Sequence, residues 1–195
     1  MARKRKIEPN DILDVEAYAA IRKERKAEMI AHKRNRRIMV GPNATVHFES
    51  FDTMLYQVQE MLHTERGGDE QLEDELRAYQ PLIPQGNELV CTFMLEYEDP
   101  VIRARELMKL GGIEETITLE FEGEKIPADW EKDVDRTTPD GKTSSLHFLH
   151  FRFSPEQAAA FAKKGTRVIL AVGHEHYGHM AVLPETTRGE LAEDL

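Results

Sequence analysis

The chain has 195 residues, of which 40% are hydrophobic and 32% are charged, and its formal net charge is −10. This composition is typical of a globular protein with a well-solvated surface, and it excludes an intrinsically disordered chain. The negative charge argues against nucleic-acid binding by the whole molecule, and no apolar run is long enough to span a membrane. The single cysteine, Cys91, cannot form an internal disulfide, and no apolar segment follows the basic residues 3–6. We therefore expect a cytoplasmic protein without a secretory signal.

The first predicted element is a long helix that begins after Asp14, a favoured N-cap residue, and runs to about Arg37. Its apolar positions form only a broken stripe, so we expect it to be half exposed. Lys and Arg crowd residues 3–37, whereas acidic residues dominate the rest of the chain. A basic helix on an acidic body is suited to dock on an acidic protein surface, and the alternative is an ordinary solvated helix face. The docking residues that we select from this segment are Arg22, Arg25 and Arg36.

A β-hairpin and two further helices come next. The turn Gly41-Pro42-Asn43 separates a strand at 38–40 from a strand at 44–49. A second helix covers about 51–66, with an apolar stripe on one side, and a third runs from 69 to 79. Pro81 and Pro84 then break the chain. We divide the chain there into a helix-rich N-terminal region, 1–86, and an α+β region, 87–195, packed together.

The second half alternates strands and helices. Strands are predicted at 88–98, 115–122, 145–153 and 166–173, with helices after Asp99-Pro100 and after a capping box that begins at Ser154. The order βαββαβ predicts a ferredoxin-like sheet with both helices on one face. A further strand near 178–183 returns as a C-terminal hairpin. The expected fold class is α+β.

The hairpin tip carries the most unusual residues of the chain, in the stretch VGHEHYGH. His174, His176 and His179 are weak candidates for a metal site. The spacing differs from H-E-x-x-H, and in an extended strand His179 has the opposite parity to the other two. A polar hairpin tip is the preferred interpretation. Glu60 and His63 have the Glu-x-x-His spacing of di-iron bundles, but such a site needs a second copy of the motif. We predict no cofactor.

Three segments resemble an uncharacterised bacterial family, a domain of unknown function: DILDVEAYAAIRKERKAEMIAHKRNRRIMVGP, FESFDTMLYQVQEMLHTER and YQPLIP. The resemblance covers nearly the whole chain. Genes of that family are often neighbours of genes for rubrerythrin and for an iron–sulfur oxidoreductase, which implies a link to redox or peroxide stress. His174 and Tyr177 match an Asp-His-Pro-x-Tyr turn of the family, although Gly173 and Glu175 replace its Asp and Pro.

The resemblance also selects candidate site residues on and near the second helix. They are Glu49, Thr53, Gln57, Glu60, Met61, Glu65, Tyr79, Pro81 and Pro84. Thr53, Gln57 and Glu60 share one polar face, opposite the apolar stripe, and Glu49 ends the preceding strand. Such a cluster is suited to hydrogen-bond a partner or ligand, and it is equally suited to tie the helix to the C-terminal sheet.

Two main hypotheses follow. The favoured one is a non-catalytic accessory protein that docks on a redox partner, with rubrerythrin or the iron–sulfur oxidoreductase as suspected partners. The alternative is a small metal-assisted enzyme that uses Glu49, Glu60 and histidines. A regulator that senses a ligand or binds nucleic acid through the basic helix is a third reading, and self-association into a homo-oligomer stays open. Ferredoxin-like folds serve all of these functions, so the expected fold does not choose between them.

Overall fold

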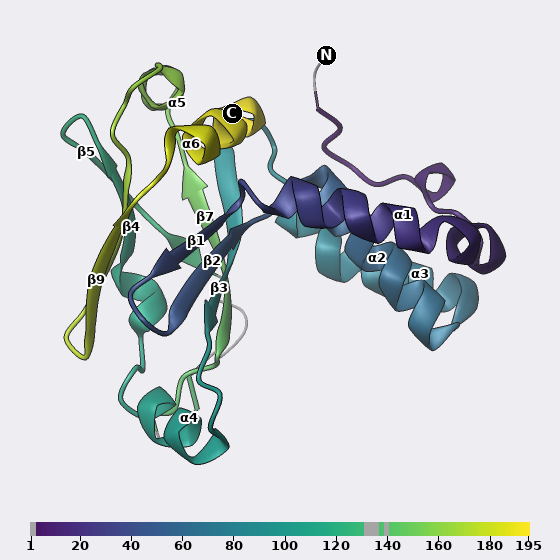
Figure 1. Cartoon of the computed structure of the whole chain (residues 1–195), viewed down its shortest axis with the longest axis horizontal. Coiled ribbons are helices and arrows are strands. Elements are labelled where there is room, and N and C mark those ends of the chain that lie inside the picture. The colour runs from purple at the N-terminus through teal and green to yellow at the C-terminus, as the bar shows by residue number, and fades with distance from the viewer. Residues whose placement is uncertain (1–2, 131–136, 139–140) are drawn as a thin grey trace.

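The computed structural model of the chain describes residues 3–130, 137–138 and 141–195. Its strands form two antiparallel sheets (Figure 1). The first has the order β1-β2-β3-β7-β6, with β1 (Arg37–Val40), β2 (Ala44–Phe48), β3 (Glu88–Leu95), β7 (Leu146–Arg152) and β6 (Asp129–Trp130). The second has the order β5-β4-β8-β9, with β5 (Glu124–Pro127), β4 (Ile117–Phe121), β8 (Ile169–His174) and β9 (Tyr177–Val182).

The two sheets pack face to face around one apolar core and form what we call the sandwich. Alternate residues of each strand point inward, as the pleat of a strand requires. Val46 and Phe93 of the first sheet and Leu119 and Leu170 of the second belong to this core and are at most 1% exposed. Short helices lie at the ends of the sandwich: α5 (Pro155–Ala162) and α6 (Glu185–Leu191) at one end, and α4 (Pro100–Leu107) at the other (Figure 1).

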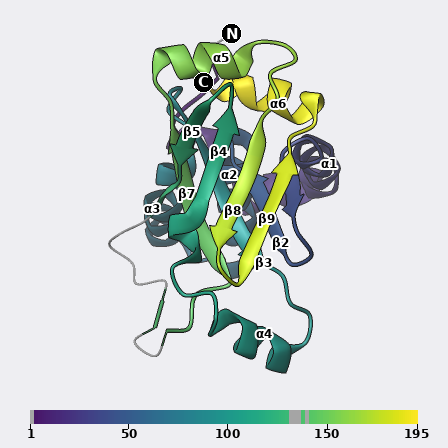
Figure 2. The same ribbon diagram turned by 90° about the vertical axis from the view of Figure 1, so that its left-hand side faces the viewer.

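Three helices project from the first sheet and form the helical arm (Figure 1). They are α1 (Val15–Lys33), α2 (Phe51–Glu65) and α3 (Gly68–Tyr79). A second apolar cluster joins Met54, Val58 and Leu62 of α2 to Ile7, Ile83 and Val90. Because Val90 belongs to β3, the arm packs on the outer face of the first sheet. Among the described residues, no helix lies over the outer face of the second sheet (Figure 2).

One corner of the sandwich is closed by Tyr177. Its hydroxyl donates to the carbonyl of Val40 at 2.8 Å and accepts from the backbone N–H of Asn43 at 2.9 Å. The turn between β1 and β2 therefore binds directly to β9. Gly41 in that turn has a φ of 72°, and a Cβ there would lie 2.5 Å from the ring of His179. Only glycine fits this position without displacing the ring.

The structure confirms the α+β class and several predicted elements. The hairpin at 38–49 is β1 and β2, the second and third helices are α2 and α3, and the C-terminal hairpin strand is β9. Ser154 and Gln157 form the expected capping box of α5. The first helix ends at Lys33 instead of near Arg37, because the chain turns there to begin β1. Whether the chain divides at residue 86 stays a prediction, although β2 and β3 pair across that point.

The prediction of a single ferredoxin-like sheet is wrong. Strands β3 and β7 lie in the first sheet, whereas β4 and β8 lie in the second. The physical reason lies in the two helices that were expected to cover one face. Among its residues α4 fully buries only Leu107, and α5 only Phe161. Neither has the apolar stripe needed to cover a sheet. The apolar strand faces instead cover each other, which is the sandwich solution to the same burial problem.

Candidate functional site

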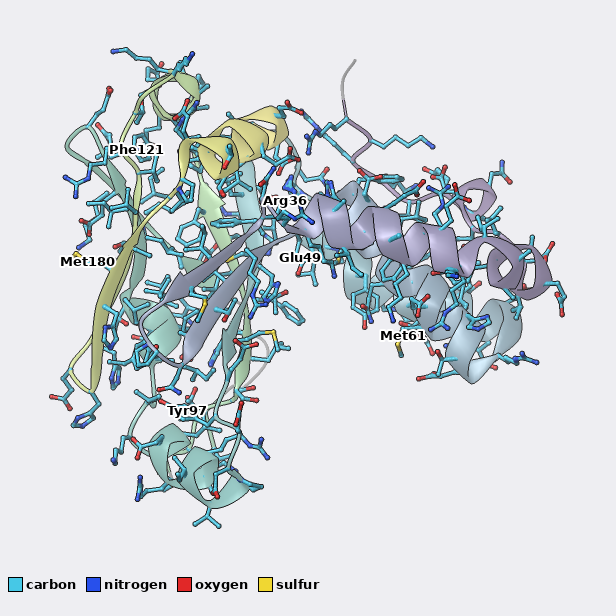
Figure 3. The ribbon with its side chains drawn as sticks, in the orientation of Figure 1. Arg36, Glu49, Met61, Tyr97, Phe121 and Met180 are labelled. Atoms are coloured by element: carbon cyan, nitrogen blue, oxygen red, sulfur yellow. The ribbon has the colours of Figure 1, made fainter. Side chains whose placement is uncertain are left out.

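Glu49 lies where the arm meets the sandwich, between β2 and α2 (Figure 3). Its residue is only 7% exposed, and both carboxylate oxygens accept a hydroxyl hydrogen bond of 2.7 Å, one from Thr53 of α2 and one from Thr92 of β3. A buried carboxylate needs such partners, because desolvation without them is costly. Glu49 therefore ties the start of α2 to the first sheet.

Ser50, the next residue, joins α2 to the end of α1. It is the N-cap of α2, and its hydroxyl accepts from the backbone N–H of Thr53. The same hydroxyl lies 3.0 Å from Nε2 of His32 on α1. Burial, with a smaller contribution from Arg36, lowers the pKa of His32 below its ordinary value of 6.5. The imidazole is thus neutral at pH 7, and it can accept the Ser50 hydroxyl hydrogen.

Glu60 makes the second strong contact between α1 and α2. It accepts from Arg22 through Nε at 2.9 Å and Nη2 at 2.7 Å, and from the Tyr18 hydroxyl at 2.6 Å. The hydrogen bonds from Arg22 are the main reason that the pKa of Glu60 is lowered. Burial, followed by the Glu60 carboxylate, raises the pKa of the Tyr18 hydroxyl. This forked arginine–carboxylate pair joins α1 to α2.

The remaining candidates form separate contacts along the arm. Gln57 donates to the Tyr79 hydroxyl at 3.4 Å, and Glu65 accepts from Gln71 at 3.1 Å. Thr53 and Glu65 are twelve residues apart, or about 18 Å along the helix axis. The selected residues therefore do not converge on one point. Glu49 binds β3, Glu60 binds α1, and Gln57 and Glu65 bind two points of α3.

A cleft of about 250 Å³ lies between residues 11–13, α1 and α2. Its walls combine the aromatic and apolar side chains of Tyr18, Met29, Leu55 and Tyr56 with the charged side chains of Asp11, Arg25, Glu28 and Asp52. Arg25 is paired with Glu28 at 3.1 Å. The volume is below the range of about 300–1,000 Å³ that is usual for small-molecule pockets. The cleft has room for one side chain of a partner.

Arg36 is buried, with 1% of its side chain exposed, and this differs from its selection as a docking residue. Its guanidinium binds Asp194, with Nη1 at 2.8 Å from Oδ2, and Arg3 binds the other oxygen of the same carboxylate at 2.7 Å. Burial raises the pKa of Asp194 even though both arginines oppose the shift. Arg36 therefore fastens the chain between α1 and β1 to the C-terminal segment and is not available to a partner.

The exposed side of α1 carries a different set of residues, which we call the basic face: Lys23, Lys26, Ile30 and Arg34. All four are exposed, and Ile30 is 60% exposed. They follow one another at intervals of three or four residues, the spacing that places side chains on one side of a helix. Sequence reasoning selected Arg22, Arg25 and Arg36 from this segment and did not consider which cations share the exposed side of the helix. The helical spacing of the lysines was the signal that could have found it.

The histidine-rich stretch forms the tip of the hairpin of β8 and β9, as predicted, with a two-residue loop. The rings of His174 and His176 are 5.8 Å apart, and Nε2 of His174 lies 3.2 Å from the carbonyl of Gly111. The ring of His179 packs against Tyr177 and the turn at Gly41. Within the residues that the structure describes, no group of three His, Cys, Asp or Glu side chains is arranged to hold a metal ion. No helix in this part of the chain is both long and apolar enough to cross a bilayer.

Comparison with known proteins identifies the family. The family model described as "Protein of unknown function (DUF3501)" matches residues 6–195. The chain belongs to the DUF3501 family. A solved structure is similar over nearly its whole length: a novel protein of unknown function from Burkholderia pseudomallei K96243, 34% identical, with a TM-score of 0.90. The match covers 97% of the present chain and 99% of that chain. The search of curated proteins found no match.

The family match and the structural match both include the arm. Because the two chains superpose over almost all of their residues, the arm and the sandwich occur together in both proteins. Neither description gives an activity. The function of this DUF3501 protein must be argued from its own surface.

Proposed function

We propose that this protein is a non-catalytic accessory protein of a bacterial redox or peroxide-stress system. It docks on an acidic surface of a protein partner through the basic face of α1. The partner is a redox protein, with rubrerythrin or an iron–sulfur oxidoreductase as the first candidates.

The observation that carries the proposal is the exposed basic face on a projecting arm. Residues 3–37 hold 12 of the 26 Lys and Arg residues but only 6 of the 36 Asp and Glu residues. Lys26 and Arg34 lie one helical turn before and after the exposed Ile30, and Lys23 lies one turn further along the same side. An exposed isoleucine in a row of cations offers an apolar anchor together with electrostatic attraction, a combination that supports protein docking.

The choice of a redox partner depends on the family resemblance. Genes of the family are often neighbours of those for rubrerythrin and an iron–sulfur oxidoreductase, and neighbouring bacterial genes commonly serve one process. The polar contacts of α2 support an accessory role over a catalytic one. Both oxygens of Glu49 and both oxygens of Glu60 accept hydrogen bonds within the protein. No observation favours the metal-assisted enzyme built on these two carboxylates.

The test measures binding of the purified protein to purified rubrerythrin and to the iron–sulfur oxidoreductase from the same organism, at low and high salt. Binding should weaken with salt, because the Debye length falls from about 10 Å at 0.1 M to about 3 Å at 1 M. Reversing the three cations of the basic face (Lys23→Glu, Lys26→Glu, Arg34→Glu) should slow association more than it speeds dissociation.

A matched control makes the same change of charge on another exposed surface: Lys163→Glu, Lys164→Glu and Arg167→Glu, beyond α5. The control should bind nearly as fast as wild type. The proposal is wrong if neither candidate partner binds. The docking role of the basic face is wrong if both triple variants associate equally fast.

A further inference from the structure

Of the four edge strands in the described part of the chain, β9 is the longest and the one with neither a charged residue nor a proline. β6 has two residues, and β5 carries Glu124, Lys125 and Pro127. β1 has four residues, begins with Arg37 and ends against Tyr177. β9 has six residues, with the sequence YGHMAV, and contains neither a charged residue nor a proline. Charges, prolines and short length are the usual means by which proteins block pairing at an edge, and β9 uses none of them.

The backbone N–H groups of Gly178, Met180 and Val182 point away from β8, toward the open edge of the sheet. In a hairpin with a two-residue loop, the two residues that close the loop exchange backbone hydrogen bonds, and so does every second pair after them. In this hairpin the closing residues are His174 and Tyr177. The N–H of Leu183, which has the parity of Tyr177, donates to Val168 at 2.9 Å. The even-numbered amides of β9 therefore face the open edge. Among the described residues, no backbone group outside the sheet forms a hydrogen bond with these three amides.

The side chains beside this edge are apolar and exposed. Met180 is 70% exposed and Val182 52% exposed, and Met180 points away from the core (Figure 3). They lie on the sheet face that no helix covers (Figure 2). Next to them on the same face lie Ala171 and Ile169 of β8. The nearest charged side chains in these two rows, Glu120 and Lys125, neutralise each other at 3.1 Å.

An identical strand is complementary to this edge. Two copies of a chain with a net charge of −10 repel each other, so a contact between them needs a surface without excess acid. β9 is such a surface. Antiparallel pairing about a two-fold axis at Met180 would place each Val182 opposite Gly178 of the partner subunit, where no side chain competes for space. Isologous contacts of this kind are the commonest in homo-oligomers.

We propose that β9 pairs with β9 of a second copy of this chain, so that the two four-stranded sheets join into one. The contact is small, because it consists of one ladder of six residues and the apolar side chains beside it. The dimer is therefore reversible and depends on concentration. It is independent of the basic face, which lies on the arm.

Sedimentation velocity across a wide concentration series, with the full chain alone, tests the proposal. Wild type should shift from monomer to dimer as concentration rises. Met180→Lys should raise the dissociation constant about tenfold or more, because it places two like charges opposite each other. Val101→Lys, on α4 where Val101 is 79% exposed, is the matched control and should dimerise as wild type does.

Two further measurements keep the test decisive if the lysine variant folds poorly. Met180→Cys should form a disulfide-linked dimer on mild oxidation, whereas wild type should not, because its single cysteine, Cys91, is fully buried. Hydrogen exchange at Met180 and Val182 should slow as wild type dimerises. A chain that is monomeric at every concentration overturns the proposal. So does a dimer that Met180→Lys leaves intact or that leaves the amides of β9 unprotected.

Discussion

The interior of the sandwich and the interior of the helical arm are stabilised by different contacts. The sandwich has a continuous apolar core to which both sheets contribute, and its central residues are fully buried. In α1 only Tyr18 is buried, and in α3 no residue is. The arm has a smaller apolar cluster, built on Met54, Val58 and Leu62 of α2. Polar contacts through Ser50 and Glu60 join α1 to α2, and Glu49 joins α2 to β3. Apolar burial is distributed over many residues and tolerates small changes, whereas each polar contact depends on one geometry.

The largest effect should come from the sandwich. Phe93→Ala removes a fully buried ring from the core, and it should lower the free energy of unfolding by about 3–5 kcal/mol. This is a large part of the total stability of a typical domain. Urea unfolding followed by circular dichroism measures the loss. If the arm folded independently, α-helical signal would persist after the sheets had unfolded. The sandwich and the arm would then be two separate folding units.

A smaller effect is expected at the junction. Glu49→Ala leaves the hydroxyls of Thr53 and Thr92 without their carboxylate, at a cost of about 1–3 kcal/mol. Hydrogen exchange should speed up in α2 more than in β4 or β8. The control is Glu65→Ala near the exposed end of the same helix, which should change stability little. If hydrogen exchange sped up as much in both sheets as in α2, the junction would not act on the arm alone.

The smallest effect should appear as a dependence on pH. The folded protein lowers the pKa of Glu60 below its ordinary value of 4.5, chiefly through Arg22. Ionised Glu60 therefore stabilises the folded state above pH 4.5, and this contribution is lost as pH falls through the lowered pKa. Unfolding measured over a pH series should show that the difference between wild type and Glu60→Gln shrinks below pH 4.5. Glu24→Gln, on the exposed side of α1, should show no such convergence.

Local patterns in the sequence predicted the individual elements but not their assembly. The strand predicted at 115–122 is β4, and the turn at Gly41 identified the first hairpin. The partner of each strand depends on contacts between residues far apart in the chain, and a βαββαβ order is compatible with either one sheet or two. The lack of an apolar stripe in α4 and α5 was the property that argued for two sheets.

The candidate site was predicted in composition but not in arrangement. Glu49 bonds Thr92 of β3 and so ties α2 to a strand of the C-terminal region, as one of the two interpretations required, whereas Glu60 bonds Tyr18 and Arg22 of α1. Their partners Thr92, Arg22 and Tyr18 come from β3 and α1, and spacing along α2 carries no information about them. Arg36 was misplaced because the end of α1 was set too late, which put a buried linker residue on a helix surface.

Two of the three connections between the arm and the sandwich have a mechanical consequence; the third, residues 80–87, leads from α3 to β3. Only residues 34–36 separate α1 from β1, and only residues 49–50 separate β2 from α2. Each connection contains a buried ionisable residue, Arg36 in one and Glu49 in the other, and each is bonded to a distant part of the chain. A hinge needs residues that are free to change their backbone angles, and neither connection provides them. A force applied to the tip of the arm is therefore transmitted to β1 and β2 as a torque on the sheet, and the arm cannot swing without breaking one of these bonds.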